Sequence, residues 1–196
     1  YDKAQARYDR ALSIRRELGD SRALALSLSH VGTLLAHRGQ FKNALAHFRE
    51  ALDLRRKSGD LQGIAESLNT IGVIFNERGD NESAARIWRE ALDVARDAGD
   101  RSMEAVLLNN LGEIEIALGD LRGAEDHLKE ACDIAEAVGD RRVVFDAIRN
   151  LGVLQARKGS LNLAIDHVEE ALDMAKALRS RVMEGVALRT LGELHG

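Results

Sequence analysis

The sequence contains no proline, a single cysteine and few aromatic residues, and each shortage narrows the fold and the function. Cys132 alone cannot form an intramolecular disulfide and is consistent with a reducing compartment, so we expect a cytoplasmic protein. No apolar run approaches the roughly 18 residues of a membrane-spanning helix, and no signal peptide is recognisable. The net charge of −4 comes from interleaved basic and acidic residues, so we expect neither nucleic acid nor a membrane as a partner.

The residues that are present favour helices. Hydrophobic residues make up 45% of the 196 residues and charged residues 31%, which suits a globular chain with a sizeable core. Alanine, leucine, arginine, aspartate and glutamate dominate, and there is no sustained period of two that would indicate strands. The sequence therefore predicts an all-α fold.

A repeat of 40 residues runs through the whole chain. Gly-Asp pairs recur at 19–20, 59–60, 99–100 and 139–140. Two further glycine columns keep the same spacing, one at Gly39, Gly79, Gly119 and Gly159, the other at Gly32, Gly72, Gly112, Gly152 and Gly192. Alanine columns run through Ala4, Ala44, Ala84, Ala124 and Ala164, and through Ala11, Ala51, Ala91, Ala131 and Ala171. Agreement between several columns predicts a repeat architecture.

Each repeat unit is expected to contain two antiparallel helices. Segments of about 17 residues with helical apolar spacing lie between the glycines. The glycines suit the left-handed residue that ends a helix, and the aspartates after them, with Ser180 in the same column, suit the N-cap of the next one. The mid-helix glycines predict close packing: we expect Gly72 to face Ala84, while Phe48, Trp88 and Leu128 fill the adjacent column.

These units resemble the tetratricopeptide repeat family. The resemblance rests on "LSHVGTLL" (28–35), "LNTIGVIF" (68–75), "LNNLGEIE" (108–115), "IRNLGVLQ" (148–155) and "LRTLGELH" (188–195), and on the small–large–small second helix typified by Ala44, Phe48 and Ala51. The usual unit has about 34 residues. The longer unit resembles the version found in polarity adaptors, kinesin light chains and bacterial regulators. The resemblance implies an α-α superhelix, or solenoid, of helix pairs. The sequence departs from the family in lacking the terminal proline of each unit, and in Glu115, Gln155 and His195 where Leu35 and Phe75 are apolar.

Counting the columns gives one solenoid domain over residues 1–196, which we interpret as a fragment of a larger protein. It is expected to comprise a lone second helix (1–18), complete repeats at 21–58, 61–98, 101–138 and 141–178, and a lone first helix (181–195). Because no polar capping repeat is recognisable, apolar residues should lie on both open ends, among them Leu188, Leu191 and Leu194 at one and Tyr8 and Leu12 at the other. We therefore expect head-to-tail self-association of copies.

The residues that could carry chemistry have simpler structural interpretations. His47, His127 and His167 each precede a glutamate by three residues, but one His and one Glu per helix do not make a closed metal site, so a solvated face with local pairs is preferred. Cys132 replaces leucine in an apolar column and is interpreted as a buried thiol. Since no phosphate-binding loop, hydrolase elbow or zinc signature occurs, we expect no enzyme, cofactor or metal.

The resemblance assigns partner binding to the concave groove lined by the first helix of each unit. Asn in this register often holds the backbone of a bound peptide, and Arg often receives a carboxylate. The matching positions predict the contacts Asn69, Asn109, Asn110, Glu113, Arg149, Asn150, Arg157 and Arg189. Neighbouring groove positions are Ser29, His30, Thr33, His37, Glu66, Asn76, Glu77, Ile116, Asp146 and Glu193.

We therefore expect a protein–protein interaction scaffold that binds a protein or peptide in this groove. Two alternatives remain open at this point. One is a ligand- or peptide-sensing module of a bacterial signalling or transcription regulator, and the other is a structural spacer or self-assembling segment. Purely solvated polar residues on a curved surface would also give this pattern.

Overall fold

The structure, a computed structural model, describes residues 2–195, apart from the side chains of residues 2–6, 8 and 9. In this range it contains ten α-helices and no strand. Their bounds are α1 (Asp2–Leu18), α2 (Ser21–His37), α3 (Phe41–Ser58), α4 (Leu61–Glu77), α5 (Asn81–Asp97), α6 (Arg101–Leu118), α7 (Leu121–Val138), α8 (Arg141–Arg157), α9 (Leu161–Ala177) and α10 (Arg181–His195). No helix in the described range is long and apolar enough to span a bilayer.

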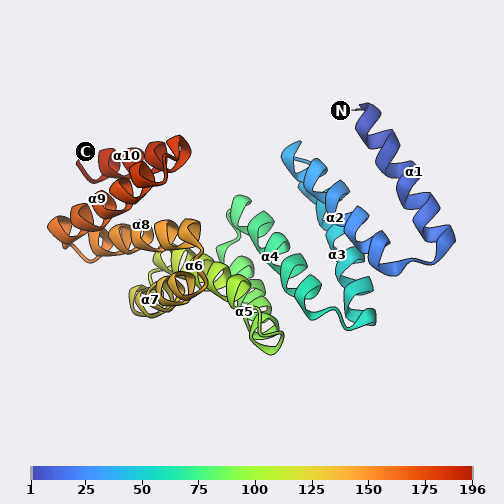
Figure 1. The fold of residues 1–196 in the computed structure, drawn as a ribbon, viewed down its shortest axis with the longest axis horizontal. Coiled ribbons are helices and arrows are strands. Elements are labelled where there is room, and N and C mark those ends of the chain that lie inside the picture. Colours follow the sequence, from blue (N-terminus) through green and yellow to red (C-terminus); the bar gives the residue numbers. More distant parts are fainter. Residues whose placement is uncertain (1, 196) are drawn as a thin grey trace. The chain divides into compact units, whose positions relative to one another are not determined.

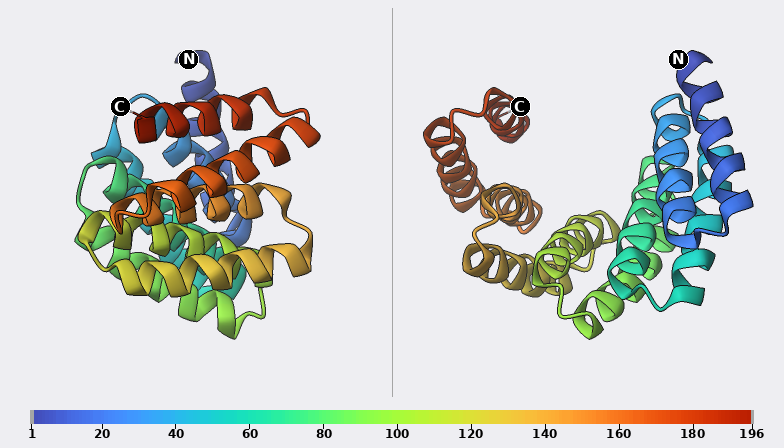
Figure 2. Two further views of the ribbon diagram at one scale, coloured as in Figure 1. Left: turned by 90° about the vertical axis from the view of Figure 1, so that its left-hand side faces the viewer. Right: turned by 45° about the vertical axis from the view of Figure 1, so that its right-hand side comes forward.

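The all-α fold of tetratricopeptide-like helix pairs is confirmed. The first helices of the repeats are α2, α4, α6, α8 and α10, and each of the first four packs against the second helix that follows it (Figure 1). The chain divides into two compact units, Tyr1–Gly99 and Asp100–Gly196. Both views in Figure 2 show α8, α9 and α10 as successive neighbours within the second unit. The organisation as one domain over 1–196 stays a prediction.

The predicted N-cap aspartates and the predicted helix-ending glycines are both confirmed. The carboxylate of Asp20 accepts a hydrogen bond from the backbone N–H of Ala23 at 2.9 Å, and Asp60 caps α4 in the same way. The helix-ending glycines adopt the left-handed conformation, as at Gly139 with φ +78°. Since capping satisfies N–H groups that have no partner inside the helix, each Gly-Asp pair separates two helices through local interactions alone.

Arg179 breaks the glycine pattern, because it occupies the column of Gly139 with φ +54°. A side chain in this conformation brings its Cβ close to backbone oxygen, which costs about 1–2 kcal/mol. We expect Arg179→Gly to raise the free energy of unfolding by about 0.5–1 kcal/mol, after the larger entropy loss of glycine is subtracted. Urea denaturation measures the change. Arg179→Ala, which removes the guanidinium but keeps the Cβ, should give no such gain.

The mid-helix glycines lie closest to the large residue of the partner helix, and at Gly112 and Gly152 the backbone of the small residue is also near. A Cβ built on Gly32 would lie 2.8 Å from Phe48 Cζ, and one on Gly112 would lie 2.5 Å from Leu128 Cγ. The three atoms nearest to a Cβ on Gly72 belong to the indole of Trp88, and the expected contact with Ala84 stays a prediction. The indole donates a hydrogen bond from Nε1 to the Asn69 carbonyl at 3.2 Å. The glycine therefore makes room for a large side chain lying across the first helix.

The two units differ in how one repeat packs on the next. In the first unit α3 packs against α4 around the guanidinium of Arg55, a residue that is 8% exposed. In the second unit the corresponding position is Ala135, and α7 and α8 share an apolar cluster. This cluster comprises Ile116, Ala124, Leu128, Leu151 and Leu154. Ile116, expected in the groove, is 7% exposed and belongs to the core, so that expectation was wrong.

A carboxylate on α7 joins two lysines in the second unit. Glu125 accepts hydrogen bonds from Lys129 at 2.8 Å and from Lys158 at the C-terminal end of α8. These hydrogen bonds lower the pKa of Glu125 from its ordinary 4.5 to about 2, and the bond from Lys129 has the larger effect of the two. This carboxylate therefore stabilises the contact between α7 and α8 only while it is ionised.

The stabilisation by Glu125 should depend on pH in a defined window. Because its pKa is lower in the folded chain, its contribution is complete above pH 4.5 and is lost as the pH falls toward 2. We expect Glu125→Gln to reduce the unfolding free energy near neutral pH and to match the wild type near pH 2. Urea denaturation across this range tests it. The exposed Asp133→Asn on the same helix is the control, and a difference that persists at pH 2 would contradict the assignment.

Candidate functional site

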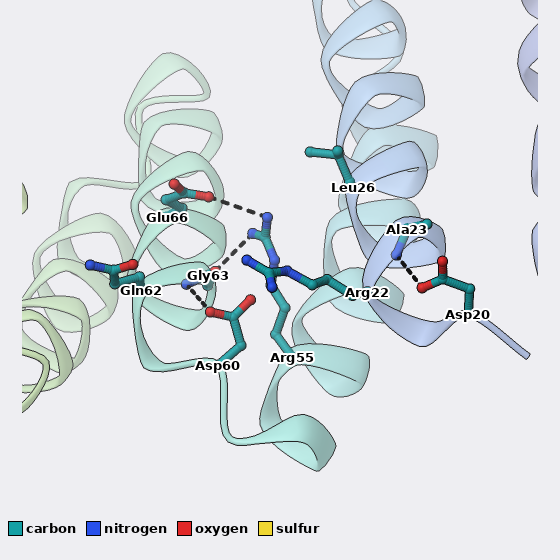
Figure 3. A pocket seen from close by; sticks show the side chains of 9 residues that line it. All are labelled: Asp20, Arg22, Ala23, Leu26, Arg55, Asp60, Gln62, Gly63 and Glu66. Carbon is teal, nitrogen blue, oxygen red and sulfur yellow. Dashed lines mark hydrogen bonds and ion pairs between the residues drawn. The ribbon is translucent and has the colours of Figure 1, made fainter.

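The first helices of the first unit border a cavity. It has a volume of about 430 Å³ and opens between the N-terminal turns of α2 and α4. Figure 3 shows its lining, which comprises Asp20, Arg22, Ala23, Leu26, Arg55, Asp60, Gln62, Gly63 and Glu66. Asp20 and Asp60 are the capping carboxylates, so the helix ends are fixed on both sides. The cavity is a polar depression with cations and carboxylates on its walls.

Arg55, at the end of α3, forms the floor of this cavity (Figure 3). Its Nη1 donates to the Gly63 carbonyl and to the Ser67 hydroxyl, both at 2.7 Å, and its Nη2 lies 3.2 Å from a carboxylate oxygen of Glu66. Buried guanidinium groups persist only where such partners replace water. Gly63 is part of this arrangement, because a Cβ there would lie 2.7 Å from Arg55 Nε.

Sequence reasoning missed Arg55, although a signal was present. Arg15 and Arg55 stand 40 residues apart, and Ser27 and Ser67 keep the same register. In the structure Arg15 repeats the pattern of Arg55, donating to the Ala23 carbonyl at 2.9 Å and to the Ser27 hydroxyl. The coincidence of the two columns predicts an Arg–Ser contact between consecutive repeats. It also explains why this junction accepts a buried charge.

Two of the predicted contact residues are not exposed. Asn109 on α6 is 7% exposed and Asn150 on α8 is 2% exposed, and the Asn150 amide donates to the Asn109 side-chain oxygen at 3.0 Å. The expectation that they lie open in the groove was therefore wrong. The physical reason is that α6 packs directly against α8, so residues facing from one first helix to the next become buried. This amide pair fixes how the two helices approach each other.

The other predicted residues keep part of their surface accessible. Glu113, Arg157 and Arg189 are exposed, whereas Asn69, Asn110 and Arg149 are half-buried. Asn69 lies in the first unit on α4, and the rest lie in the second unit on α6, α8 and α10. Thus six of the eight residues keep accessible surface, one in the first unit and five in the second.

Charge gathers on the first helices of the second unit. Burial raises the pKa of Asp146 on α8 above its ordinary range; Arg149 and Arg142 oppose this, and Glu113 on α6 adds to it. The Arg142 guanidinium lies 3.3 Å from an Asp146 oxygen. Nε of Arg149 is buried and has no hydrogen-bond partner in the described part of the chain. A partly desolvated Asp146–Arg149 surface can therefore hold polar groups of a partner more firmly than a fully hydrated one.

The histidine column does not form one uniform solvated face. His127 Nδ1 lies 2.7 Å from the carboxylate of Glu115, which is buried, so this histidine bonds across to α6. The expected local pair does occur at His167, whose Nδ1 lies 3.9 Å from Glu170. The Glu115 contact explains why a polar residue is tolerated in a column that is apolar at Leu35. Among the described residues there is no cluster of three or more His, Cys, Asp or Glu side chains able to hold a metal ion.

Cys132 is only half-buried, although its column is apolar. Burial, together with the neighbouring Glu136, raises the pKa of its thiol to about 11. The thiolate is therefore scarce near neutral pH, which argues against a role as a nucleophile.

Comparisons with family models and solved structures show what this chain is similar to. A family model described as "Tetratricopeptide repeat" matches residues 1–57 and 59–137, and one described as "Anaphase-promoting complex subunit 5" matches residues 114–194. The crystal structure of BtubC (BKLC) from P. vanneervenii is similar, with a TM-score of 0.79 and 21% identity, covering 97% of this chain and 84% of that one. The apo form of RapI is similar with a TM-score of 0.71 and 19% identity, covering 96% and 74%. A search of curated proteins finds no match.

Proposed function

Because the chain belongs to the tetratricopeptide repeat family, we propose that it is a protein–protein interaction scaffold whose first helices bind a peptide segment of a partner. Domains of this family generally mediate protein binding and are typically non-catalytic. The observation that carries the proposal is the cavity between α2 and α4, because it is bordered by first helices and its floor, Arg55, is already held in place. A preorganised polar depression binds a segment without first having to order its own side chains.

In the second unit the accessible residues suit the polar backbone and side chains of a peptide. The amide of Asn110 can both donate to and accept from peptide groups, and Arg149, Arg157 and Arg189 can each receive a carboxylate. Glu113 would take a basic side chain or a backbone N–H. Asn109 and Asn150 have no direct contact in this proposal; they hold α6 and α8 at the spacing that presents Asn110 and Arg149.

The test compares proteins captured by the wild-type chain with those captured by variants. Asn110→Ala combined with Arg149→Ala and Arg157→Ala should lose a defined set of partners identified by mass spectrometry, with unchanged helical circular dichroism. The matched control is Arg10→Gln with Lys57→Gln, two exposed cations outside the first helices. The same partners captured equally by the triple variant and the wild type would refute the role of this surface.

A second candidate function is head-to-tail self-association, which the surface of α10 favours. Val182 is 78% exposed and Leu188 is 55% exposed, and a Cβ built on Gly192 would have nothing within 4 Å. The expectation for the opposite end was wrong at Leu12, which is 4% exposed because α1 packs against α2, while the side chain of Tyr8 lies outside the described residues. Light scattering tests the candidate: mass should rise with concentration for the wild type and not for Leu188→Glu. A monomer throughout would exclude it.

A further inference from the structure

A second cavity in the first unit has a strongly one-sided charge. Its volume is about 690 Å³, and it lies at the turn between α2 and α3, against the C-terminal end of α4. Its lining includes three cationic side chains and two phenylalanines but no carboxylate. The residues that matter here are Phe41, Lys42, Leu45, Arg49, Phe75 and Arg78.

The cations of this cavity are not engaged by the chain itself. Lys42, Arg49 and Arg78 are exposed, and within the described residues none of their side chains forms a hydrogen bond or ion pair. Phe41 and Phe75 are half-buried, so each keeps part of an aromatic ring accessible beside these cations. The cavity therefore offers unused donors next to apolar surface.

The 40-residue repeat shows what such a pair of cations can hold. Two repeat lengths after Arg49 and Arg78 come Lys129 and Lys158. In the structure both of those lysines bond to the carboxylate of Glu125. The position of Glu125 is occupied by Leu45 in the earlier repeat. Side chains in these two columns thus reach one carboxylate where one is present, and the cavity at Arg49 and Arg78 lacks it.

We propose that this cavity binds an acidic side chain of a partner protein, with an adjacent apolar residue of the same segment packed against Phe41 and Phe75. Arginine receives a carboxylate through two parallel hydrogen bonds, which fixes its orientation. Rings at this position bury apolar surface that a purely ionic contact would leave exposed. The ligand class is a short acidic peptide segment with one large apolar residue.

A protein segment fits the surroundings better than a nucleic acid does. A neighbouring cavity shares Arg49 and Phe75 with this one, but it also contains the carboxylates of Asp53 and Glu90. Arg56 and Arg86 line that neighbouring cavity as well, so its charge is mixed, whereas the cavity at Arg49 and Arg78 has no carboxylate. A phosphate backbone extending beyond it would meet these carboxylates, whereas a single glutamate or aspartate would not.

The site can be tested with a defined peptide. The probe is the fluorescein-labelled peptide acetyl-Glu-Glu-Phe-Glu-Glu-amide, and its anisotropy is measured at low salt against the complete chain. We expect saturable binding that weakens with salt, because the contact is partly ionic. Arg49→Gln with Arg78→Gln should weaken binding by about tenfold or more, whereas Arg10→Gln with Lys57→Gln, which removes the same charge elsewhere, should not.

Two changes separate the ionic from the apolar contribution. A peptide with glutamine in place of every glutamate should lose binding, and one with alanine in place of phenylalanine should bind about tenfold more weakly. Leu45→Glu should also weaken binding, because it supplies the carboxylate that Glu125 supplies in the later repeat. If Leu45→Glu unfolds the chain, the arginine pair decides the question alone.

Three outcomes would overturn the proposal. The first is that the peptide shows no saturable binding. The second is that the arginine variant and the control variant lose equal affinity for the peptide. The third is that the chain binds a hexauridylate oligonucleotide more tightly than the peptide. Because this cavity lies in the first unit, whereas Asn110 and Arg149 lie in the second, the outcome of the partner-capture experiment would leave this result unaffected. Failure here would likewise leave the proposed scaffold function standing.

Discussion

Gly152→Ala is expected to lower the free energy of unfolding by about 2 kcal/mol, a large effect for a single added methyl group. A Cβ at this position would lie 2.5 Å from Cγ2 of Val168 and 3.0 Å from the carbonyl oxygen of Ala164. Valine is branched at Cβ and rotates poorly inside a helix, and the carbonyl belongs to the backbone, so neither neighbour can move away cheaply. The strain exceeds the helix propensity that alanine gains over glycine, about 1 kcal/mol.

Gly192→Ala is the matched control for this prediction. It lies in the same column, one repeat later, but a Cβ there meets nothing within 4 Å. The substitution should therefore be neutral or stabilise the chain by up to about 1 kcal/mol, through helix propensity alone. Urea denaturation of both variants gives the two values with opposite signs. Equal effects at Gly152 and Gly192 would show that the contact with Val168 is not what requires glycine.

His127→Leu is expected to cost about 2 kcal/mol, because the buried Glu115 carboxylate loses one of its partners, the imidazole 2.7 Å away. Replacing the other member of the pair should reduce the free energy of unfolding much less. Glu115→Leu restores the apolar residue found at Leu35 in the same column, and it leaves behind a histidine that is 28% exposed and can reach water. The asymmetry follows from burial. The buried carboxylate cannot bond to water in place of the histidine, so removing the histidine costs more free energy of unfolding than removing the carboxylate.

The double variant Glu115→Leu with His127→Leu completes the cycle. We expect it to recover most of the stability lost in His127→Leu, because no buried carboxylate remains. Thermal and urea denaturation at constant pH give the four free energies. Simple addition of the two single losses would show that the pair does not interact, and the explanation for a polar residue at position 115 would fail.

Much of the fold could be predicted from local features. The Gly-Asp pairs end one helix and cap the next, and these interactions span only a few residues, so their positions can be read directly from the sequence. The apolar columns likewise identify the face of each helix that packs. Leu108, Leu111 and Ile114 follow that pattern and are all buried.

The candidate site was less predictable, because exposure depends on neighbouring repeats. Asn69 and Asn109 stand in the same column, yet the first is half-buried and the second is buried against Asn150. Asn109 lies on the face of α6 that packs directly on α8, so its burial comes from the side chains of the next repeat. The position of a residue in the 40-residue repeat does not by itself predict the distance between successive first helices.

The sequence by itself determined the helices, their ends, their pairing and the family, since all four follow from short-range periodicity and repeated columns. Only the tertiary structure decided which polar residues stay accessible. It buried Asn109, Asn150 and Glu115, placed Arg55 under a cavity, and left Arg49 and Arg78 without the carboxylate that their counterparts share. The physical reason is that burial and charge pairing depend on side chains from different helices, whose separation no local pattern fixes.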